Sequence, residues 1–235
     1  GQVQSHLIGT DAFQETDMIG VSRPIVKHSF TVDKQENIAN IVAQAFHIAT
    51  SGRQGPVLID VPKDLTNPDD LFDFVYPDKV HIRSYNPPTK PENHQVSRAV
   101  DAILASERPV IYAGGGTISS NASKELRELN DLIDAPVTNT LMGLGVFPGT
   151  HKRFLGMLGM HGTYQANMAM HNADLIIALG ARFDDRITNA PDKFAPRAKV
   201  IHFDVDHSSV SKIIEADIAV FGQIKDSLQA INLSL

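Results

Sequence analysis

The strongest constraint on the fold is a regular alternation of short apolar runs and amphipathic segments from residue 93 to residue 235. The apolar runs have the length of buried strands, and the segments between them place apolar residues at helical spacing. This alternation predicts right-handed crossovers and an α/β fold, in which a parallel sheet carries helices on both faces. The strands are expected at residues 110–113, 137–139, 175–179, 200–204 and 218–220, and the helices near 95–105, 121–132, 164–171 and 208–214.

The first part of the chain carries a shorter version of the same pattern. Apolar residues at helical spacing predict a helix over residues 35–50, and a buried strand is expected at 57–61. A short helix is expected at 11–17 and an extended piece at 25–32. Two strands cannot close a parallel sheet, so we interpret residues 1–62 as the C-terminal part of an α/β domain that belongs to a longer chain.

A proline-rich segment separates the two parts. Six of the 13 prolines lie between Pro62 and Pro91, in a stretch without sustained periodicity. Such a stretch is typical of a linker that runs over a surface. The sequence therefore predicts a partial α/β domain at residues 1–62, a linker at 63–92 and a central domain at 93–235.

Composition excludes several kinds of function. The absence of cysteine excludes disulfides, thiolate zinc sites and a cysteine nucleophile. The net charge of −6 argues against a nucleic acid or an anionic membrane surface as the main partner. Apolar runs such as residues 175–179 are too short to span a membrane. The ten histidines show no metal-ligand spacing of the H-E-x-x-H kind, so no metal site is predicted in this chain.

Two clusters follow predicted strands, at the edge of a parallel sheet where ligands bind. The glycines at 114–116 follow the strand at 110–113. They allow backbone N–H groups to approach an anion such as a nucleotide phosphate, or they form a tight β–α turn. Residues 182–186, Arg-Phe-Asp-Asp-Arg, follow the strand at 175–179. They bind a phosphate or carboxylate, or they form a solvated loop of weak ion pairs.

Two further features concern a nucleotide-type ligand. Five of the six methionines lie between Met142 and Met170, within and just after a glycine-rich loop at 141–163. Methionine packs well on flat aromatic surfaces, so the loop suits a planar ring system such as a flavin, or it reflects irregular core packing. Asp204 or Asp206 closes a strand, where an acid accepts a hydrogen bond from a ribose hydroxyl or caps the next helix.

Nine stretches, in this order along the chain, give the sequence a specific resemblance. They are Gly1–Val3, Ile8–Glu15, Ser51–Arg53, Gly55–Pro56, Asp60–Asp64, Gly114–Gly116, Leu141–Gly145, Gly156–Gly162 and Arg182–Arg186. Together they resemble the catalytic large subunit of the acetohydroxyacid synthase (acetolactate synthase) family over nearly the whole chain.

The resemblance implies an activity. Members of this family condense pyruvate with a second pyruvate or with 2-ketobutyrate, with loss of CO₂, using thiamine diphosphate, Mg²⁺ and FAD. The reaction begins branched-chain amino acid synthesis. By resemblance, residues 1–62 are the end of the pyrimidine-binding domain, and residues 93–235 are the central FAD-binding domain.

The resemblance also implies roles for single residues. Gln14 would line the pocket beside the thiamine, with Phe13 near it, and Lys63 would lie at the substrate channel. Arg186 would bind the carboxylate of the second keto acid, and Met160 would face both the flavin and the channel.

A larger set would contact FAD. Its members are Arg53, Gly114, Gly115, Gly116, Thr140, Leu141, Met142, Met160, His161, Gly162, Gly180, Ala181, Arg182, Asp184, Asp204, Val205, Gly222 and Gln223. Two positions depart from the family pattern. Gln4 stands where many members carry proline or a small residue, and Gln223 stands where an acidic residue is common.

The implied enzyme extends beyond this chain. Its activating glutamate is expected before Gly1, and the segment that holds Mg²⁺ and diphosphate is expected after Leu235. The chain alone is therefore expected to be inactive. The complete subunit is expected to form a homodimer or tetramer with a small regulatory subunit as a further partner, in the cytoplasm or in a plastid or mitochondrion. The alternatives are another thiamine diphosphate enzyme, such as a catabolic acetolactate synthase, a carboligase or an oxalyl-CoA decarboxylase, and a non-catalytic nucleotide-binding module.

Overall fold

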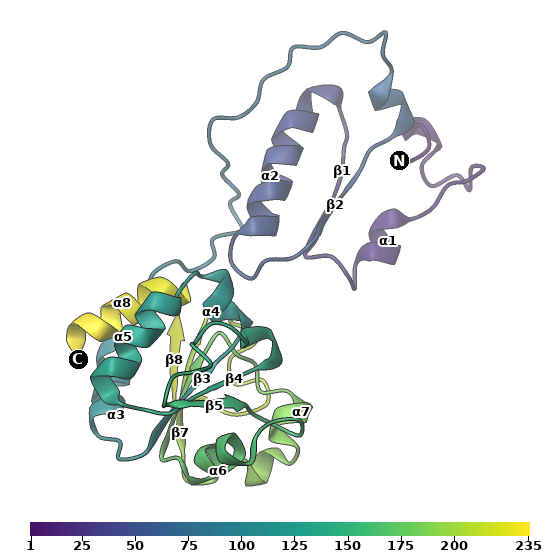
Figure 1. Cartoon of the computed structure of the whole chain (residues 1–235). Helices are drawn as coiled ribbons and strands as arrows, with labels where there is room; N and C mark the ends of the chain where they lie inside the picture. The colour runs from purple at the N-terminus through teal and green to yellow at the C-terminus, as the bar shows by residue number, and fades with distance from the viewer. The chain divides into compact units, whose positions relative to one another are not determined.

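The computed structural model describes all 235 residues and divides them into two compact units, Gly1–Asn86 and Pro87–Leu235. Both units have parallel strands, and helices cover the strands of each (Figure 1). None of the helices has the length and apolar character needed to cross a lipid bilayer.

A six-stranded, wholly parallel sheet forms the centre of the second unit. Its strand order is β5-β4-β3-β6-β7-β8, so the chain starts in the middle, moves to one edge, and then returns to build the other half. The order reverses between β3 and β6, and ligands of such sheets bind outside the strand ends at this switch point. The strands are β3 (Pro109–Ala113), β4 (Val137–Asn139), β5 (Phe154–Met157), β6 (Leu175–Leu179), β7 (Lys199–Asp204) and β8 (Ile218–Phe221).

Helices cover the two faces of this sheet unequally. On one face, α3 (Asn93–Leu104), α5 (Ser123–Ile133) and α8 (Ile224–Ser234) pack together over the strands (Figure 1). The apolar side chains of these three helices form the larger core with residues such as Ile111 and Ile177. On the other face, α6 (Tyr164–Asn172) covers a second core.

The central strands are buried on both faces. In β6 every residue from Leu175 to Leu179 is buried, with alternate side chains in the two cores. This explains why these strands appear as continuous apolar runs in the sequence. The α/β fold with a parallel sheet and helices on both faces is therefore confirmed.

Two expectations about this unit are wrong. Residues 208–214 form turns instead of a helix, because the Asp206 carboxylate accepts hydrogen bonds from Ser208 and Ser209, and Ser211 has a φ of +57°. Such local side-chain bonds compete with helix formation. The loop expected at 141–163 contains the edge strand β5, whose Gly156 obscures any strand pattern.

Three helices of this unit were not expected, and one of them is the single turn α7 (Asp185–Thr188). The helix α4 (Gly115–Ser119) begins inside the glycine run, although glycine is a poor helix former. The final helix α8 was overlooked, although Ile224, Leu228 and Ile231 repeat at helical spacing and are all buried.

The first unit holds two parallel strands, β1 (His28–Thr31) and β2 (Val57–Asp60), which are covered by α2 (Ile38–Thr50). Three short 3₁₀ turns and one short helix complete it. They are η1 (Ser5–Leu7), α1 (Met18–Ser22), η2 (Gln35–Asn37) and η3 (Lys63–Thr66).

The helix expected at residues 11–17 is absent. Asp11 and Gln14 both have positive φ angles, and the Glu15 carboxylate accepts hydrogen bonds from the amides of Gly9 and Ala12. These bonds close a turn, and they lower the pKa of Glu15 below its ordinary value. A helix begins only at Met18, one residue after the expected segment ends, with α1, where the Asp17 carboxylate accepts a hydrogen bond from the Gly20 amide at 2.8 Å.

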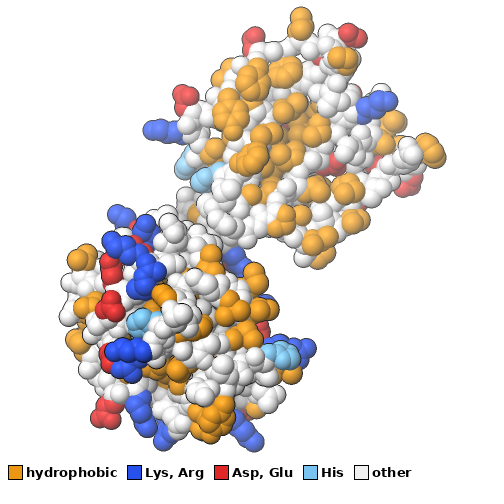
Figure 2. All heavy atoms as spheres, viewed as in Figure 1, with side chains coloured by type: hydrophobic (Ala, Val, Ile, Leu, Met, Phe, Trp, Pro, Cys, Tyr) orange, Lys and Arg blue, Asp and Glu red, His pale blue; other side chains and the backbone are white.

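The expected linker at residues 63–92 is only partly free of the first unit. The Tyr85 hydroxyl accepts a hydrogen bond from Lys27 Nζ at 2.6 Å and donates to the Ser51 carbonyl at 2.9 Å. Along the chain, the first compact unit ends at Asn86 and the second begins at Pro87, so the last part of the expected linker is divided between them. Hydrophobic side chains remain exposed on the first unit (Figure 2), among them Phe46, Leu71 and Phe74.

Candidate functional site

The turns that follow β3 and β6 meet at the switch point, and glycine makes their contact possible. The amides of Gly114 and Gly116 donate to the carbonyls of Leu179 at 2.9 Å and Gly180 at 3.0 Å. A Cβ on Gly114 would lie 2.3 Å from the Gly180 carbonyl oxygen. The tight turn therefore accounts for both glycines, and their amides are already used within the protein. In contrast, a Cβ on Gly115 would meet the Met142 side chain at 3.2 Å, with no backbone group nearer.

The turn after β4 presents two apolar side chains to solvent. Thr140 caps η4 (Leu141–Gly143) by accepting a hydrogen bond from the Gly143 amide at 3.0 Å. Gly143 packs directly on the Ala113 carbonyl, where a Cβ would approach to 2.3 Å. This fixed turn leaves Leu141 69% exposed and Met142 75% exposed. Exposed apolar side chains at a ligand-binding edge suggest a surface for a flat apolar group.

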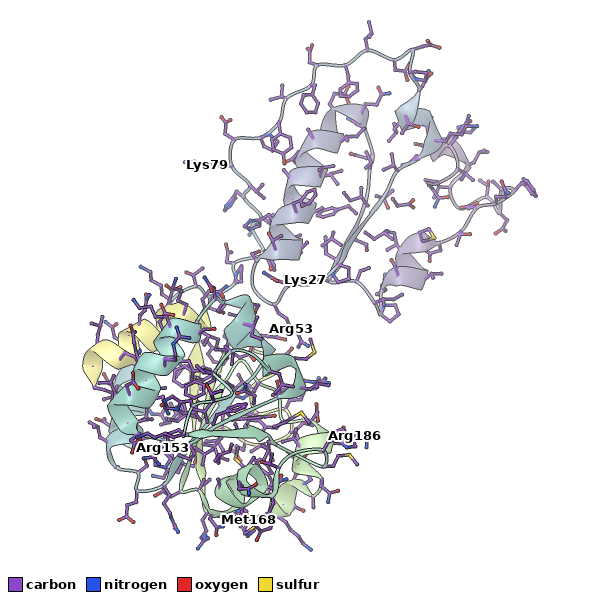
Figure 3. The ribbon with its side chains drawn as sticks, in the orientation of Figure 1. Lys27, Arg53, Lys79, Arg153, Met168 and Arg186 are labelled. Atoms are coloured by element: carbon purple, nitrogen blue, oxygen red, sulfur yellow. The ribbon has the colours of Figure 1, made fainter.

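The glycine-rich loop after β5 is bonded to α7 (Asp185–Thr188). The Met160 amide donates to the Arg186 carbonyl at 3.0 Å, so the two residues are neighbours although 26 positions separate them. Met160 is 65% exposed. The Arg186 side chain extends outward from α7 (Figure 3) and is 71% exposed.

Charged side chains surround the start of α7. Asp184 caps this helix, and its carboxylate accepts a hydrogen bond from the Arg186 amide at 3.0 Å. Arg182 lies 3.7 Å from Asp184, and Arg186 lies 3.6 Å from Asp185. Both arginines are about 71% exposed in their side chains. Exposed ion pairs of this length contribute little to stability, so either guanidinium can turn to an anionic ligand at low cost.

In the sheet order β7 adjoins β6, one strand of the switch point, whereas β8 is the edge strand beyond it. Asp204 is largely buried and accepts a hydrogen bond from the Asp206 amide at 2.9 Å. Burial raises the pKa of Asp204 above its ordinary value. Gln223 accepts a hydrogen bond from the Ser120 hydroxyl at 3.2 Å and so ties the start of α8 to the end of α4. The Gln223 side chain therefore has a hydrogen-bond partner within the protein, at a position where members of the acetohydroxyacid synthase family commonly carry an acidic residue.

A buried polar group beneath the edge was missed by sequence reasoning. Tyr112, Ala178 and His202 face one another across β3, β6 and β7, and the Phe183 ring lies 5.6 Å from Tyr112 and 5.5 Å from His202. The Tyr112 hydroxyl and both His202 nitrogens lack hydrogen-bond partners. Burial lowers the pKa of His202 and raises that of Tyr112. The signal in the sequence was a histidine inside an otherwise apolar strand.

Comparison with known proteins identifies the family. The model for the family "Thiamine pyrophosphate enzyme, central domain" matches residues 96–231, which is 136 of the 235 residues. The chain belongs to the thiamine pyrophosphate enzyme family. The matched region contains the six-stranded sheet, so the glycine contact and the exposed methionines lie within the central domain of this family.

Nearly the whole length of this thiamine pyrophosphate enzyme chain is similar in sequence to proteins with known names. It is 56% identical to the acetolactate synthase large subunit of Buchnera aphidicola subsp. Acyrthosiphon pisum and 51% identical to acetolactate synthase isozyme 3 large subunit of Escherichia coli, in each case over 97% of the chain. It is 48% identical over 96% of the chain to acetolactate synthase of Mycobacterium bovis. The chain spans 40%, 40% and 36% of the lengths of these proteins, respectively.

The expected site residues of the thiamine pyrophosphate enzyme chain fall into both units. Gln14, Lys63 and Arg53 lie in the first unit, all exposed, and Gln14 has a φ of +64°. The N-terminal segment pairs with the chain after β2, since the Lys63 amide donates to the Gln2 carbonyl at 3.1 Å. Phe13, expected near Gln14, also lies in the first unit, and the remaining expected residues lie in the second unit. In that unit, the structure brings together Gly114, Gly116, Gly180 and Ala181, and separately Met160 and Arg186.

Proposed function

We propose that this chain is a portion of a biosynthetic acetolactate synthase large subunit, which joins two 2-keto acids with loss of CO₂. The observation that carries the proposal is 56% identity to a named acetolactate synthase large subunit over 97% of the chain. The identity extends over both units, so the proposal covers the end of the pyrimidine-binding domain at residues 1–62 and the FAD-binding domain at 93–235.

The second unit fits an FAD at its switch-point edge. The exposed side chains of Leu141, Met142 and Met160 offer an apolar surface for a planar ring. Arg182 offers a guanidinium for a phosphate, and the partly buried Asp204 offers a carboxylate at the strand end where ribose hydroxyls bind. The phosphates would not bind the amides of Gly114 and Gly116, which already donate to carbonyls.

Arg186 is the residue proposed to bind the second substrate. Its planar fork can hold a carboxylate through two parallel hydrogen bonds. The neighbouring Met160 would shield the reacting carbons from water. Its side chain is apolar and exposed, and its amide is hydrogen-bonded to the Arg186 carbonyl. Thiamine diphosphate, when bound, would supply the electron sink for decarboxylation.

The complete enzyme needs parts outside this chain. Gln14 and Lys63 are exposed in the first unit, and both are proposed to face a pocket that other segments complete. The glutamate that activates the thiamine and the segment that binds Mg²⁺ are proposed to belong to the rest of the subunit. A homodimer or tetramer, a small regulatory subunit and a cytoplasmic location belong to the same proposal, supported by relatives that are named large subunits of bacteria.

The experiment tests the complete subunit that contains this sequence. Purified protein supplied with thiamine diphosphate, Mg²⁺ and FAD is expected to form acetolactate from pyruvate and to carry a flavin absorbance band. Arg186→Lys is expected to lower kcat/KM by about tenfold or more through the KM of the second keto acid, because an ammonium cannot form the paired bonds. Arg127→Lys, an exposed arginine on α5, is the matched control. A wild-type subunit without acetolactate formation would refute the proposal, and a flavin-free, fully active enzyme would refute its FAD part.

A further inference from the structure

Asn167 reaches back from α6 to the loop that precedes the helix. Its Oδ1 accepts a hydrogen bond from the Gly159 amide at 3.1 Å. Its Nδ2 donates to the Gly159 carbonyl at 3.1 Å and to the Thr163 carbonyl at 3.0 Å. One side-chain amide, with an acceptor on one side and a donor on the other, therefore engages both backbone groups of a single glycine.

The glycine held in this way lies against α7. Gly159 is buried and has a φ of +100°, and a Cβ there would lie 2.6 Å from the Arg186 carbonyl oxygen. The next residue, Met160, donates its amide to that same carbonyl at 3.0 Å. The backbone of Gly159 and Met160 is thus the contact through which the loop fixes Arg186.

The other bonds of the loop do not replace Asn167. The Gly162 amide donates to the Gly159 carbonyl at 2.9 Å, and the Thr163 amide donates to the Met157 carbonyl at 2.9 Å. Both bonds close the turn on itself, and neither uses the Gly159 amide, whose partner is Asn167. Loss of Asn167 would leave a buried N–H without its acceptor, which is costly, so the turn would rearrange.

We propose that Asn167 is a positioning residue that holds the turn at residues 159–161 and thereby fixes Met160 beside Arg186. This inference rests on the proposed function, in which Met160 and Arg186 face the second keto acid. Asn167 itself does not touch substrate. Its effect reaches the reaction through the Met160 amide and the Arg186 carbonyl.

The first test uses the 235-residue chain and amide hydrogen exchange followed by mass spectrometry. Asn167→Asp keeps the acceptor for the Gly159 amide but removes both donors and places a carboxylate against two carbonyls. Exchange over residues 158–162 is expected to accelerate about tenfold, the effect of losing roughly 1.4 kcal/mol of local protection, while β3 and β6 keep the wild-type rate. Asn167→Ala removes all three bonds, including the acceptor for the Gly159 amide, without adding a charge, and it serves if the first variant does not fold.

The matched control is Asn172→Asp, which is the same substitution on the same helix. Asn172 bonds to the Met168 carbonyl and to Arg197, away from the loop. Its exchange over residues 158–162 is expected to equal that of the wild type. Unchanged exchange in the Asn167 variants, or equal acceleration in the control, would overturn the role of Asn167.

The second test measures kinetics in the complete subunit. Asn167→Asp is expected to raise the KM of the second keto acid about tenfold, the order expected from loss of about 1.4 kcal/mol of binding, with a smaller change in kcat. The Asn172→Asp subunit should keep both constants. Faster exchange with an unchanged KM would overturn the inference. Failure of the wild type to form acetolactate would instead refute the proposed function, so the two outcomes are separable.

Discussion

His202 is a titratable residue enclosed in the interior of the second unit. Its side chain is fully buried in β7, in contact with the Phe183 ring, and 3.8 Å from Asp204. Burial disfavours the imidazolium and lowers the pKa of His202 below its ordinary value, although the nearby Asp204 carboxylate opposes this effect. The histidine is therefore neutral in the folded protein at pH 7.

This residue makes stability depend on pH in a predictable direction. The unfolded chain binds a proton at His202 near the ordinary pKa of about 6.5, while the folded chain resists it. The free energy of unfolding is therefore expected to fall as pH drops from 7 to 5, by at most about 1.4 kcal/mol per pH unit from this group. His202→Leu should flatten that slope when urea unfolding is measured at several pH values.

Asp204 acts in the opposite sense. Its raised pKa means that the folded state binds a proton more readily than the unfolded state, so its contribution to stability declines as pH rises above about 3.9.

The control for His202→Leu is His171→Leu, at an exposed residue of α6, which should retain the wild-type slope. Equal slopes for His202→Leu and the wild type would contradict the prediction.

At the scale of elements, the turns after β3 and β6 depend on a contact without side chains. Gly114→Ala would place a methyl group 2.3 Å from the Gly180 carbonyl and 2.6 Å from the Ala181 Cα. Because both groups are backbone, the turns must separate. We expect a loss of about 1–3 kcal/mol in the free energy of unfolding, measured by urea denaturation.

A second glycine provides the comparison. A Cβ on Gly149 would meet only the Phe154 ring, at 4.0 Å. Gly149→Ala should therefore change the free energy of unfolding by less than about 0.5 kcal/mol. A similar loss of unfolding free energy in both variants would contradict the prediction, because the effect would then follow from replacing any glycine by alanine and not from the contact at the switch point.

The success of sequence reasoning also differed between elements. The central strands were predicted closely because burial on both faces leaves an uninterrupted apolar run, as at Leu175–Leu179. The edge strand β5 was missed because it is short and contains Gly156. The expected helix at 208–214 failed because Asp206 bonds locally to serines, a contact that apolar periodicity does not register.

The same limit applies to the candidate site. The sequence indicated Gly114–Gly116 but left open whether a ligand or a turn required them, and the packing on Gly180 accounts for Gly114 and Gly116. Asn167 was not found because its role depends on three backbone bonds and not on a motif. The roles of Gln14 and Lys63 stay predictions.

At the scale of the whole molecule, the two units differ in their cores. Two apolar clusters fill the second unit, on both faces of its six-stranded sheet. In the first unit, the buried apolar side chains are few and mostly small, namely Val32, Ala39, Ala43, Ala45 and Ile48. A two-stranded sheet with so little apolar burial is marginal in water.

This difference predicts unequal folding of the two units when they are separated. A fragment of residues 87–235 is expected to unfold cooperatively on heating, whereas residues 1–86 alone should show no cooperative transition. Circular dichroism melting curves of the two fragments test this. Limited proteolysis of the 235-residue chain should cut first within residues 67–84, which are largely exposed and lack helix or strand. A cooperative transition in residues 1–86 would contradict the prediction.

The strand order has a consequence for how the second unit folds. The paired residues Val137 and Phe154 of β4 and β5 are 17 positions apart, whereas Pro109 and Leu175 of β3 and β6 are 66 positions apart. Longer loops close at a greater cost in chain entropy. The pairing that creates the switch point is thus the most distant in the sheet and is expected to form last. A newly synthesised chain would then form its ligand-binding crevice only when the second unit is completely folded, so that ligand binding would report the end of folding.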